Sequence, residues 1–111
     1  MYLVVPPPKR SDDLLDVGLD GAVYRIRYRW NERAGAWHMD LFDLDDDPIR
    51  LGMRLVLHEL LLRDLVHPQR PPGDFVVSAH HGGDPGLNDL GERVTLFYIE
   101  TGTTEETIFG P

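Results

Sequence analysis

The run AVYRIRYRW, which begins at residue 22, constrains the fold more than any other part of the sequence. Apolar and cationic side chains alternate strictly along it. The apolar positions are Tyr24, Ile26, Tyr28 and Trp30, and the cationic positions are Arg25, Arg27 and Arg29. A β-strand directs successive side chains to opposite faces, whereas a helix would spread both kinds around its circumference. The run therefore predicts a half-buried strand with an apolar inner face and an arginine outer face.

A second strand is predicted at residues 36–43, after a polar turn at 31–35 that contains a glycine. Its side chains alternate as well, with Trp37, Met39 and Leu41 on one face and His38, Asp40 and Phe42 on the other. A loop this short joins antiparallel neighbours. The arginines then lie opposite or diagonal to His38 and Asp40. This placement favours a solvent-facing ion-pair ladder, and an anion site formed by the arginines is the alternative.

The remaining strands are predicted from similar patterns. They span residues 14–19, 49–57, 74–81 and 93–100, and residues 2–5 form an edge strand or an extended arm. Asp20-Gly21 is a tight-turn dipeptide, and residues 58–66 fit either a short helix or a buried extended segment. The strand at 93–100 is apolar on both faces, so we expect it to be central or covered on both sides.

About seven short strands in 111 residues predict an all-β, mainly antiparallel fold. The expected architecture is a small β-sandwich or barrel with at most one short helix and extended terminal arms. We expect an N-terminal arm at residues 1–13, a single β domain at 14–100 and a C-terminal tail at 101–111. Trp30 and Trp37 are expected in the core, because they share the period of their apolar neighbours.

The composition narrows the function classes. The formal net charge is −8 and the isoelectric point is about 4.9, so the chain repels phosphate backbones and nucleic-acid binding is disfavoured. The chain has no cysteine, which excludes disulfides and thiolate metal sites. The first residues do not resemble a signal peptide, and no apolar stretch has the length of a membrane span.

The sequence carries no convincing catalytic motif. His80 and His81 are adjacent, so a strand would point them to opposite faces, and His58-Glu59 lacks the second histidine of a zinc-protease motif. The aspartates at 43–47 lack the glycine and the closing glutamate of a calcium loop and predict an acidic turn. Neither serine stands in a nucleophile-elbow context. We therefore expect no enzyme, no cofactor, and no catalytic or metal-binding residue.

The hairpin also carries a family resemblance. The string LDGAVYRIRYRWNERAGAWHMDLFDLDDDPIRLGMRL, residues 19–55, resembles the baseplate plug proteins of contractile-tailed phages. Their pattern has an L-D-G turn, an alternating strand ending in W-N, a short linker before a tryptophan, an aspartate-rich turn and a G-x-x-L segment. The loop and strand DPGLNDLGERVTLFYI, residues 84–99, is similar to the family's closing segment. The N-terminal prolines, residues 58–73 and the tail depart from that pattern.

The resemblance implies a structural virion component that seals or bridges the junction of tail tube and hub. Its implied partners are hub, tube and tape-measure proteins and copies of itself in a symmetric ring, with no nucleic acid and no membrane. It implies a location in the tail baseplate after a stage in the host cytoplasm. The expected partner contacts lie on the arms, the arginine face and the acidic turn: Tyr2, Val4, Pro7, Arg25, Arg27, Arg29, Asp45, Asp46, Ile108 and Phe109.

Two other functions remain open at this stage. The first is a non-phage β module that binds a protein or a carbohydrate. The second is a small metal-dependent enzyme that uses His58, His80, His81 and nearby carboxylates.

Overall fold

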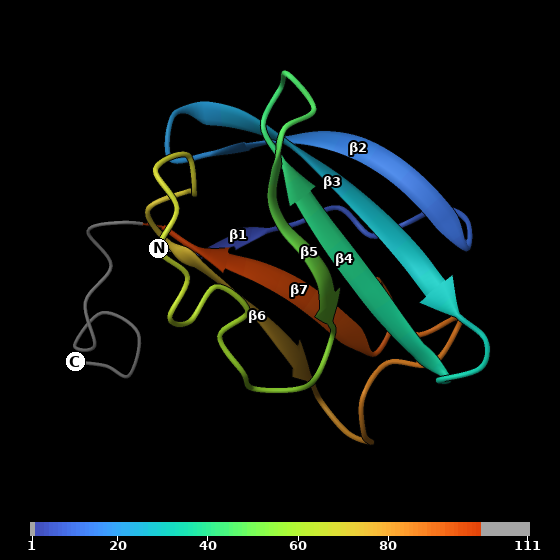
Figure 1. The fold of residues 1–111 in the computed structure, drawn as a ribbon. Helices are drawn as coiled ribbons and strands as arrows, with labels where there is room; N and C mark the ends of the chain where they lie inside the picture. The colour runs from blue at the N-terminus through green and yellow to red at the C-terminus, as the bar shows by residue number, and fades with distance from the viewer. Residues whose placement is uncertain (1, 101–111) are drawn as a thin grey trace, which may run out of the picture.

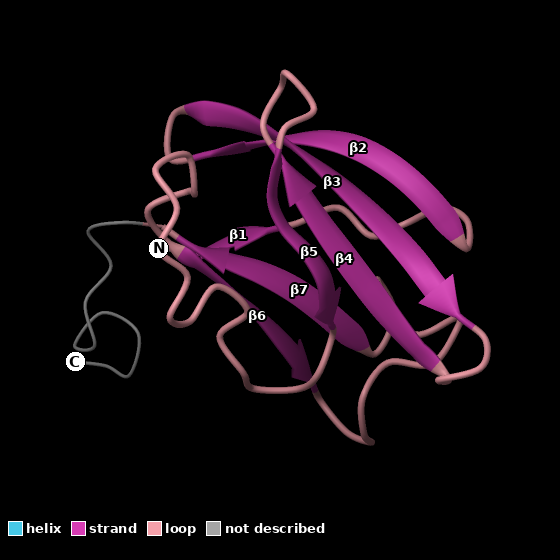
Figure 2. Cartoon of the chain, viewed as in Figure 1, coloured by secondary structure: helices cyan, strands magenta, loops and turns pink. Residues whose placement is uncertain are grey.

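The computed structural model describes residues 2–100, which form a sandwich of two antiparallel sheets (Figures 1 and 2). The larger sheet has the order β2-β3-β4-β5, and the smaller has the order β1-β7-β6. The strands are β1 (Tyr2–Val4), β2 (Asp12–Leu19), β3 (Ala22–Asn31), β4 (Ala36–Phe42), β5 (Pro48–Arg54), β6 (Asp74–Ala79) and β7 (Val94–Ile99). The prediction of an all-β antiparallel fold is confirmed, and the two separate sheets make it a sandwich.

The larger sheet is a meander whose turns follow from local sequence. Asp20 and Gly21 both have positive φ, 51° and 84°, which is the requirement of the two-residue turn that matches strand twist. In the next turn the Asn31 side chain accepts a hydrogen bond from the Ala34 N–H at 3.0 Å, and Gly35 has φ 62°. The predicted pairing is confirmed in register, with Arg27 opposite Asp40 and Arg29 opposite His38.

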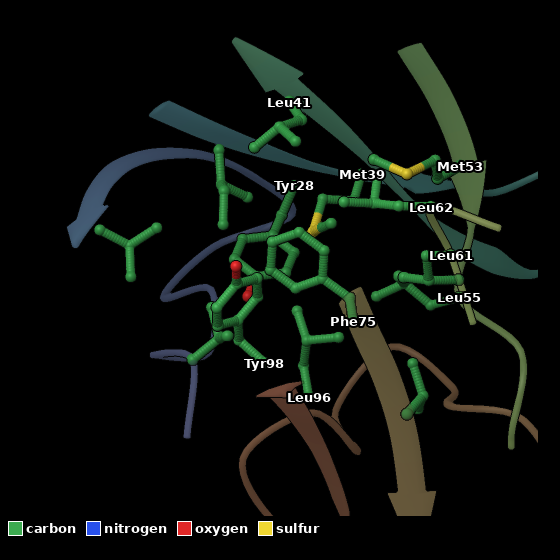
Figure 3. Close-up of a cluster of buried hydrophobic side chains, with 14 of the residues drawn as sticks. Tyr28, Met39, Leu41, Met53, Leu55, Leu61, Leu62, Phe75, Leu96 and Tyr98 are labelled. Atoms are coloured by element: carbon green, nitrogen blue, oxygen red, sulfur yellow. The ribbon is translucent and has the colours of Figure 1, made fainter. Parts of the chain in front are cut away.

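The core lies between the two sheets (Figure 3). Tyr28 and Met39 of the larger sheet and Phe75 and Tyr98 of the smaller one are fully buried, and the Phe75 and Tyr98 rings meet edge to face at 5.2 Å. Trp37 is buried as predicted, whereas Trp30 is only partly buried and packs on the edge of the cluster. Burial of aromatic and aliphatic area from both sheets is the main force that holds them together.

The two buried tyrosines keep their hydroxyls paired. The Tyr28 hydroxyl donates to the Pro6 carbonyl at 2.9 Å. The Tyr98 hydroxyl donates to the Asp20 carboxylate at 2.6 Å and accepts the Gly73 N–H at 2.7 Å. Burial raises the pKa of both phenols above the usual range. These bonds fix the N-terminal segment, the β2–β3 turn and the loop before β6 onto the core, because an unpaired buried hydroxyl is costly.

The predicted strand at 49–57 is shorter in the structure, and its alternation is broken. β5 ends at Arg54, and Leu51 is 57% exposed rather than aligned with the buried Ile49 and Met53. The cause is a β-bulge: Met39 pairs with Met53 and Leu41 with Arg50, so Asp40 faces two residues, one of which is Gly52 at φ 69°. A bulge disrupts the alternation locally, and Met53 beyond it is buried again.

The ambiguous segment at 58–66 is extended and turned, with no helix. It lies along β6 through isolated bridges, where the His58 N–H donates to the Val77 carbonyl and the Leu61 N–H to the Phe75 carbonyl. Leu61 and Leu62 are buried in the core. Within residues 2–100 there is no helix of the length and apolarity needed to span a membrane.

Tyr2–Val4 takes the edge-strand alternative, because β1 pairs with β7 and the contact continues as the Val5 N–H donates to the Leu96 carbonyl. β7 is therefore the central strand of its sheet, as predicted. Val5 is 2% exposed, so this part of the expected N-terminal arm lies on the domain. The division into arm, domain and tail at residues 13 and 100 stays a prediction, and the tail lies outside the described residues.

Candidate interaction surface

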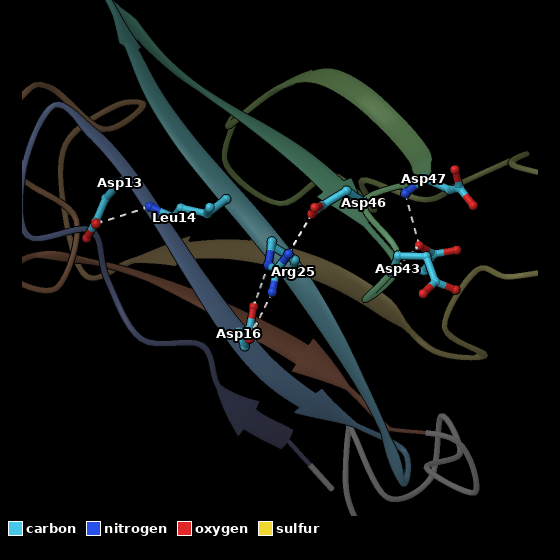
Figure 4. A network of polar contacts seen from close by, with 8 residues as sticks. Asp13, Leu14, Asp16, Arg25, Asp43, Asp46 and Asp47 are labelled. Atoms are coloured by element: carbon cyan, nitrogen blue, oxygen red, sulfur yellow. Dashed lines mark hydrogen bonds and ion pairs between the residues drawn. The ribbon is translucent and has the colours of Figure 1, made fainter.

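The outer face of the larger sheet carries the predicted ion-pair ladder. Arg25 donates to Asp16 on β2 at 2.8 Å and to Asp46 in the β4–β5 turn at 2.6 Å (Figure 4). The hydrogen bond from Arg25 holds the pKa of the Asp16 carboxyl below its usual value. One guanidinium thus ties together an edge strand and a turn that are far apart in sequence.

Arg27 and Arg29 are paired in the same way. Arg27 donates to both oxygens of Asp12 at 3.0 and 2.7 Å, a bidentate contact that lowers the pKa of that carboxyl. Arg29 contacts Asp40 diagonally at 3.1 Å. Asp40 is only 4% exposed and also accepts the Gly52 N–H at 2.7 Å, so it anchors the bulge of β5. Each of the three arginines therefore has an aspartate partner.

A shallow hollow of about 570 Å³ lies at the Trp30 end of this ladder. Its lining mixes charges of both signs with an indole and an imidazole: Ser11, Asp12, Arg27, Arg29, Trp30, Asn31, Glu32 and His38. Among residues 2–100, none forms a hydrogen bond with the Nδ1 atom of His38. The Trp30 N–H donates to Glu32 at 2.6 Å. Because aspartates already occupy the arginine forks, the geometry supports the ion-pair ladder over an anion site.

The acidic turn is built around one side chain. The Asp43 carboxylate accepts the N–H groups of Asp45 and Asp47 at 2.9 and 3.0 Å. Asp46 has φ 63°, a conformation that aspartate tolerates better than most residues. Within residues 2–100 no ion pair involves the carboxylates of Asp45 or Asp47. The predicted acidic turn is confirmed, and it presents exposed negative charge at one end of the sandwich.

The histidines are not gathered into a site. Across residues 2–100 no three His, Asp or Glu side chains lie close enough to hold a metal ion, so the metal-site alternative built on His58, His80 and His81 finds no support there. Instead, Arg93 organises the loop after β6, which contains His80 and His81. Its guanidinium donates to the carbonyls of His81, Gly83 and Asp84 and to the Asp89 carboxylate.

The expected contacts near the N-terminus lie on the smaller sheet. Tyr2 and Val4 are 44% and 57% exposed on β1, and the Tyr2 ring meets Phe97 edge to face at 6.0 Å. Pro7 lies where a side chain on Gly91 would collide with its ring. Ile108 and Phe109, the two expected contacts in the tail, lie outside the described residues.

Sequence reasoning missed several residues of these surfaces. Two missed residues are Asp16 and Asp12, the partners of Arg25 and Arg27. A signal for them exists, because the Asp-Gly turn fixes the register between β2 and β3 and so places these aspartates beside the arginines. The sequence pattern places Phe97 in a strand that is apolar on both faces, but it does not identify Val4 and Val76, which lie opposite Phe97 on the neighbouring strands. The bridge that brings Leu60 beside Val76 has no local signal in the sequence.

The chain was compared with protein families and with curated proteins. A family model described as "Cyanophage baseplate Pam3 plug gp18" matches residues 3–102. No curated protein matches the chain. The matched range covers both sheets apart from the first residue of β1.

Proposed function

The chain belongs to the family of the cyanophage baseplate plug Pam3 gp18, and from this premise we propose that it seals or bridges the junction of tail tube and hub in a contractile tail. The coarser role follows from the family itself: the chain is a structural part of a phage tail baseplate and contacts other baseplate proteins. The observation that carries the finer proposal is the match across residues 3–102, nearly the whole described fold.

The fold supports such a role physically. A part that closes a channel must keep its shape under load, and this sandwich is braced on both sides of its core. Inside, paired tyrosine hydroxyls fix loops to the sheets. Outside, Arg25, Arg27 and Arg29 connect β2, β3, β4 and the acidic turn. Because the described groups serve packing and ion pairing, the proposal assigns no catalytic residue and no cofactor.

The proposed partners are the hub, tube and tape-measure proteins, together with further copies of the chain in a symmetric ring, with no nucleic acid and no membrane. The chain would pass from the host cytoplasm into the assembled tail. The proposed contacts are Tyr2, Val4, Pro7, Arg25, Arg27, Arg29, Asp45, Asp46, Ile108 and Phe109. Among them, exposed Asp45 is the best placed for docking by charge, because its carboxylate has no cation beside it in the described fold.

Tails purified from the phage that encodes the chain test the proposal. We expect the chain to co-purify at a fixed ratio to tube, hub and tape-measure proteins, and electron cryomicroscopy to place its density on the tail axis where tube meets hub. Density at the baseplate rim would contradict the sealing role, and absence from the particle would contradict the proposal as a whole.

A complementation assay tests whether the acidic turn contributes to the incorporation of the chain into tails. A phage lacking the gene is supplied with the chain carrying Asp45→Asn and Asp46→Asn, and incorporation into tails is expected to fall severalfold. Asp64→Asn is the matched control, because Asp64 is also exposed and also has positive φ, 61°, which asparagine tolerates. Equal incorporation of both variants would remove the turn from the list of contacts.

A further inference from the structure

The two outer faces of the sandwich differ in chemistry. The outer face of β2–β5 carries arginines and aspartates that neutralise one another. The outer face of the β1-β7-β6 sheet instead carries an apolar row. Register places Val4 opposite Phe97 and Phe97 opposite Val76, and an isolated bridge adds Leu60 beside Val76. We call these four residues the apolar row.

The apolar row is open to solvent at both ends. Val4 is 57% exposed and Leu60 43%, while Phe97 and Val76 between them are partly buried. With strands about 4.8 Å apart, the row crosses roughly 14 Å of the sheet. Tyr2 adds its ring beside Phe97. Contiguous apolar surface of this kind on a small acidic protein marks a place where another surface docks.

The row is also free along one edge. Within residues 2–100, β1 has β7 on one side and no strand on the other. None of the four residues of the row is charged, so an apolar segment covering it would desolvate no ion there. An extended segment with a short apolar stretch is therefore the shape and chemistry that fits.

The chain itself supplies such a segment. Residues 101–111 lie outside the described fold and have the sequence TGTTEETIFGP, in which Ile108 and Phe109 are the only large apolar residues. The segment begins two residues after the end of β7, the strand that carries Phe97. Phe109 is the ninth residue after Glu100, so the extended segment reaches up to about 30 Å, which is twice the width of the row.

We propose that Ile108 and Phe109 of one copy pack on the apolar row of a neighbouring copy. Each copy then carries both halves of the contact on different parts of its surface. A head-to-tail contact of that type closes into a ring when the rotation between copies closes. The inference rests on the proposed function, because it requires copies that lie side by side in the baseplate.

Cysteine cross-linking tests this contact cleanly, since the natural chain has no cysteine. Thr95→Cys places a thiol on the outer face two residues from Phe97, and Gly110→Cys places one next to the apolar pair. The full-length double variant, at micromolar protein concentration, is treated with oxidised glutathione and resolved on a non-reducing gel. We expect a ladder of covalent multimers. The matched control is Val23→Cys with Gly110→Cys, because Val23 is 47% exposed on the other sheet, and we expect it to stay monomeric.

A second variant separates docking from chance collision. Ile108→Ser and Phe109→Ser in the Thr95→Cys, Gly110→Cys background should slow formation of multimers at least about tenfold, because two buried apolar side chains are lost. A faster-migrating monomer, which reports a cross-link within one chain, would overturn the proposal. So would no cross-link, or multimers that form equally fast in the control or the serine variant. If the expected cross-links are not observed but the chain still co-purifies with tails, the contact between copies is contradicted and the proposed baseplate function is not.

Discussion

Replacing Asp40 is expected to destabilise the fold far more than replacing the other aspartates of the ladder. Its carboxylate accepts the Gly52 N–H at 2.7 Å and pairs with Arg29 at 3.1 Å, with only 4% of the residue exposed. A hydrogen bond to a charged acceptor contributes about 1.5–3 kcal/mol. The ion pair adds at most about 1 kcal/mol, because Arg29 is 44% exposed and screened by water. Asp40→Ala should therefore cost about 2–3 kcal/mol.

Urea unfolding followed by tryptophan fluorescence measures this loss, with buried Trp37 as the natural reporter. At an m value of about 1.5 kcal/mol/M, the midpoint should fall by about 1.3–2 M. Asp40→Asn retains an oxygen for the Gly52 N–H and should lose less than half as much. Asp12→Ala removes an exposed partner of Arg27 and should shift the midpoint only slightly. Equal shifts for Asp40→Ala and Asp12→Ala would refute the claim that Asp40 anchors the bulge.

Two further predictions concern the loops. The Arg70 guanidinium donates hydrogen bonds to the carbonyls of Leu62, Leu65, Pro71 and Gly73. Lysine has no planar fork that could reach all of them, so Arg70→Lys should cost about 1–2 kcal/mol of folding stability and speed amide hydrogen exchange in residues 62–73. Unchanged exchange in that segment would count against this role of Arg70. The Gly86 N–H and Arg93 hold the pKa of Asp89 below its usual value of 3.8. The ionised Asp89 carboxylate therefore stabilises the folded chain above about pH 4, and this contribution is lost as the pH falls through the lowered pKa of the folded state. Between pH 5 and pH 2.5 the urea midpoint should therefore fall by less in Asp89→Asn than in the natural chain. An equal fall in both proteins would contradict the stabilising role of the Asp89 carboxylate.

The strands with regular alternation could be predicted because their signal is local. From Tyr24 to Trp30 each position is assigned to a face by its own chemistry and that of its neighbours, and the structure agrees except for the partial exposure of Trp30. The Asp20-Gly21 turn is equally local, since it depends on which residues tolerate positive φ. These signals sufficed for the fold class and for the diagonal pairing of Arg29 with Asp40.

The failures have non-local causes. Leu51 looks buried by alternation, and it is exposed because Asp40, on another strand, holds Gly52 in a bulge. Residues 58–66 have apolar side chains compatible with either a helix or an extended segment, and the choice is made by the edge of β6, which offers backbone hydrogen bonds. Arg70 and Arg93 look like ordinary surface cations, although each one closes a loop through backbone carbonyls that no spacing rule identifies.

The strand most informative about assembly is the one that violates simple amphipathic patterning. Val94, Leu96 and Tyr98 face the core of the sandwich, while Thr95, Phe97 and Ile99 on the opposite face are half-buried. A sheet with one solvated face would carry polar residues at those outer positions, as β3 does with its arginines. Because Phe97 faces away from the core between the sheets, its ring does not contribute to the packing of that core. Its place is accounted for if a second surface covers it, which a subunit of a multi-protein baseplate supplies and an isolated soluble domain does not.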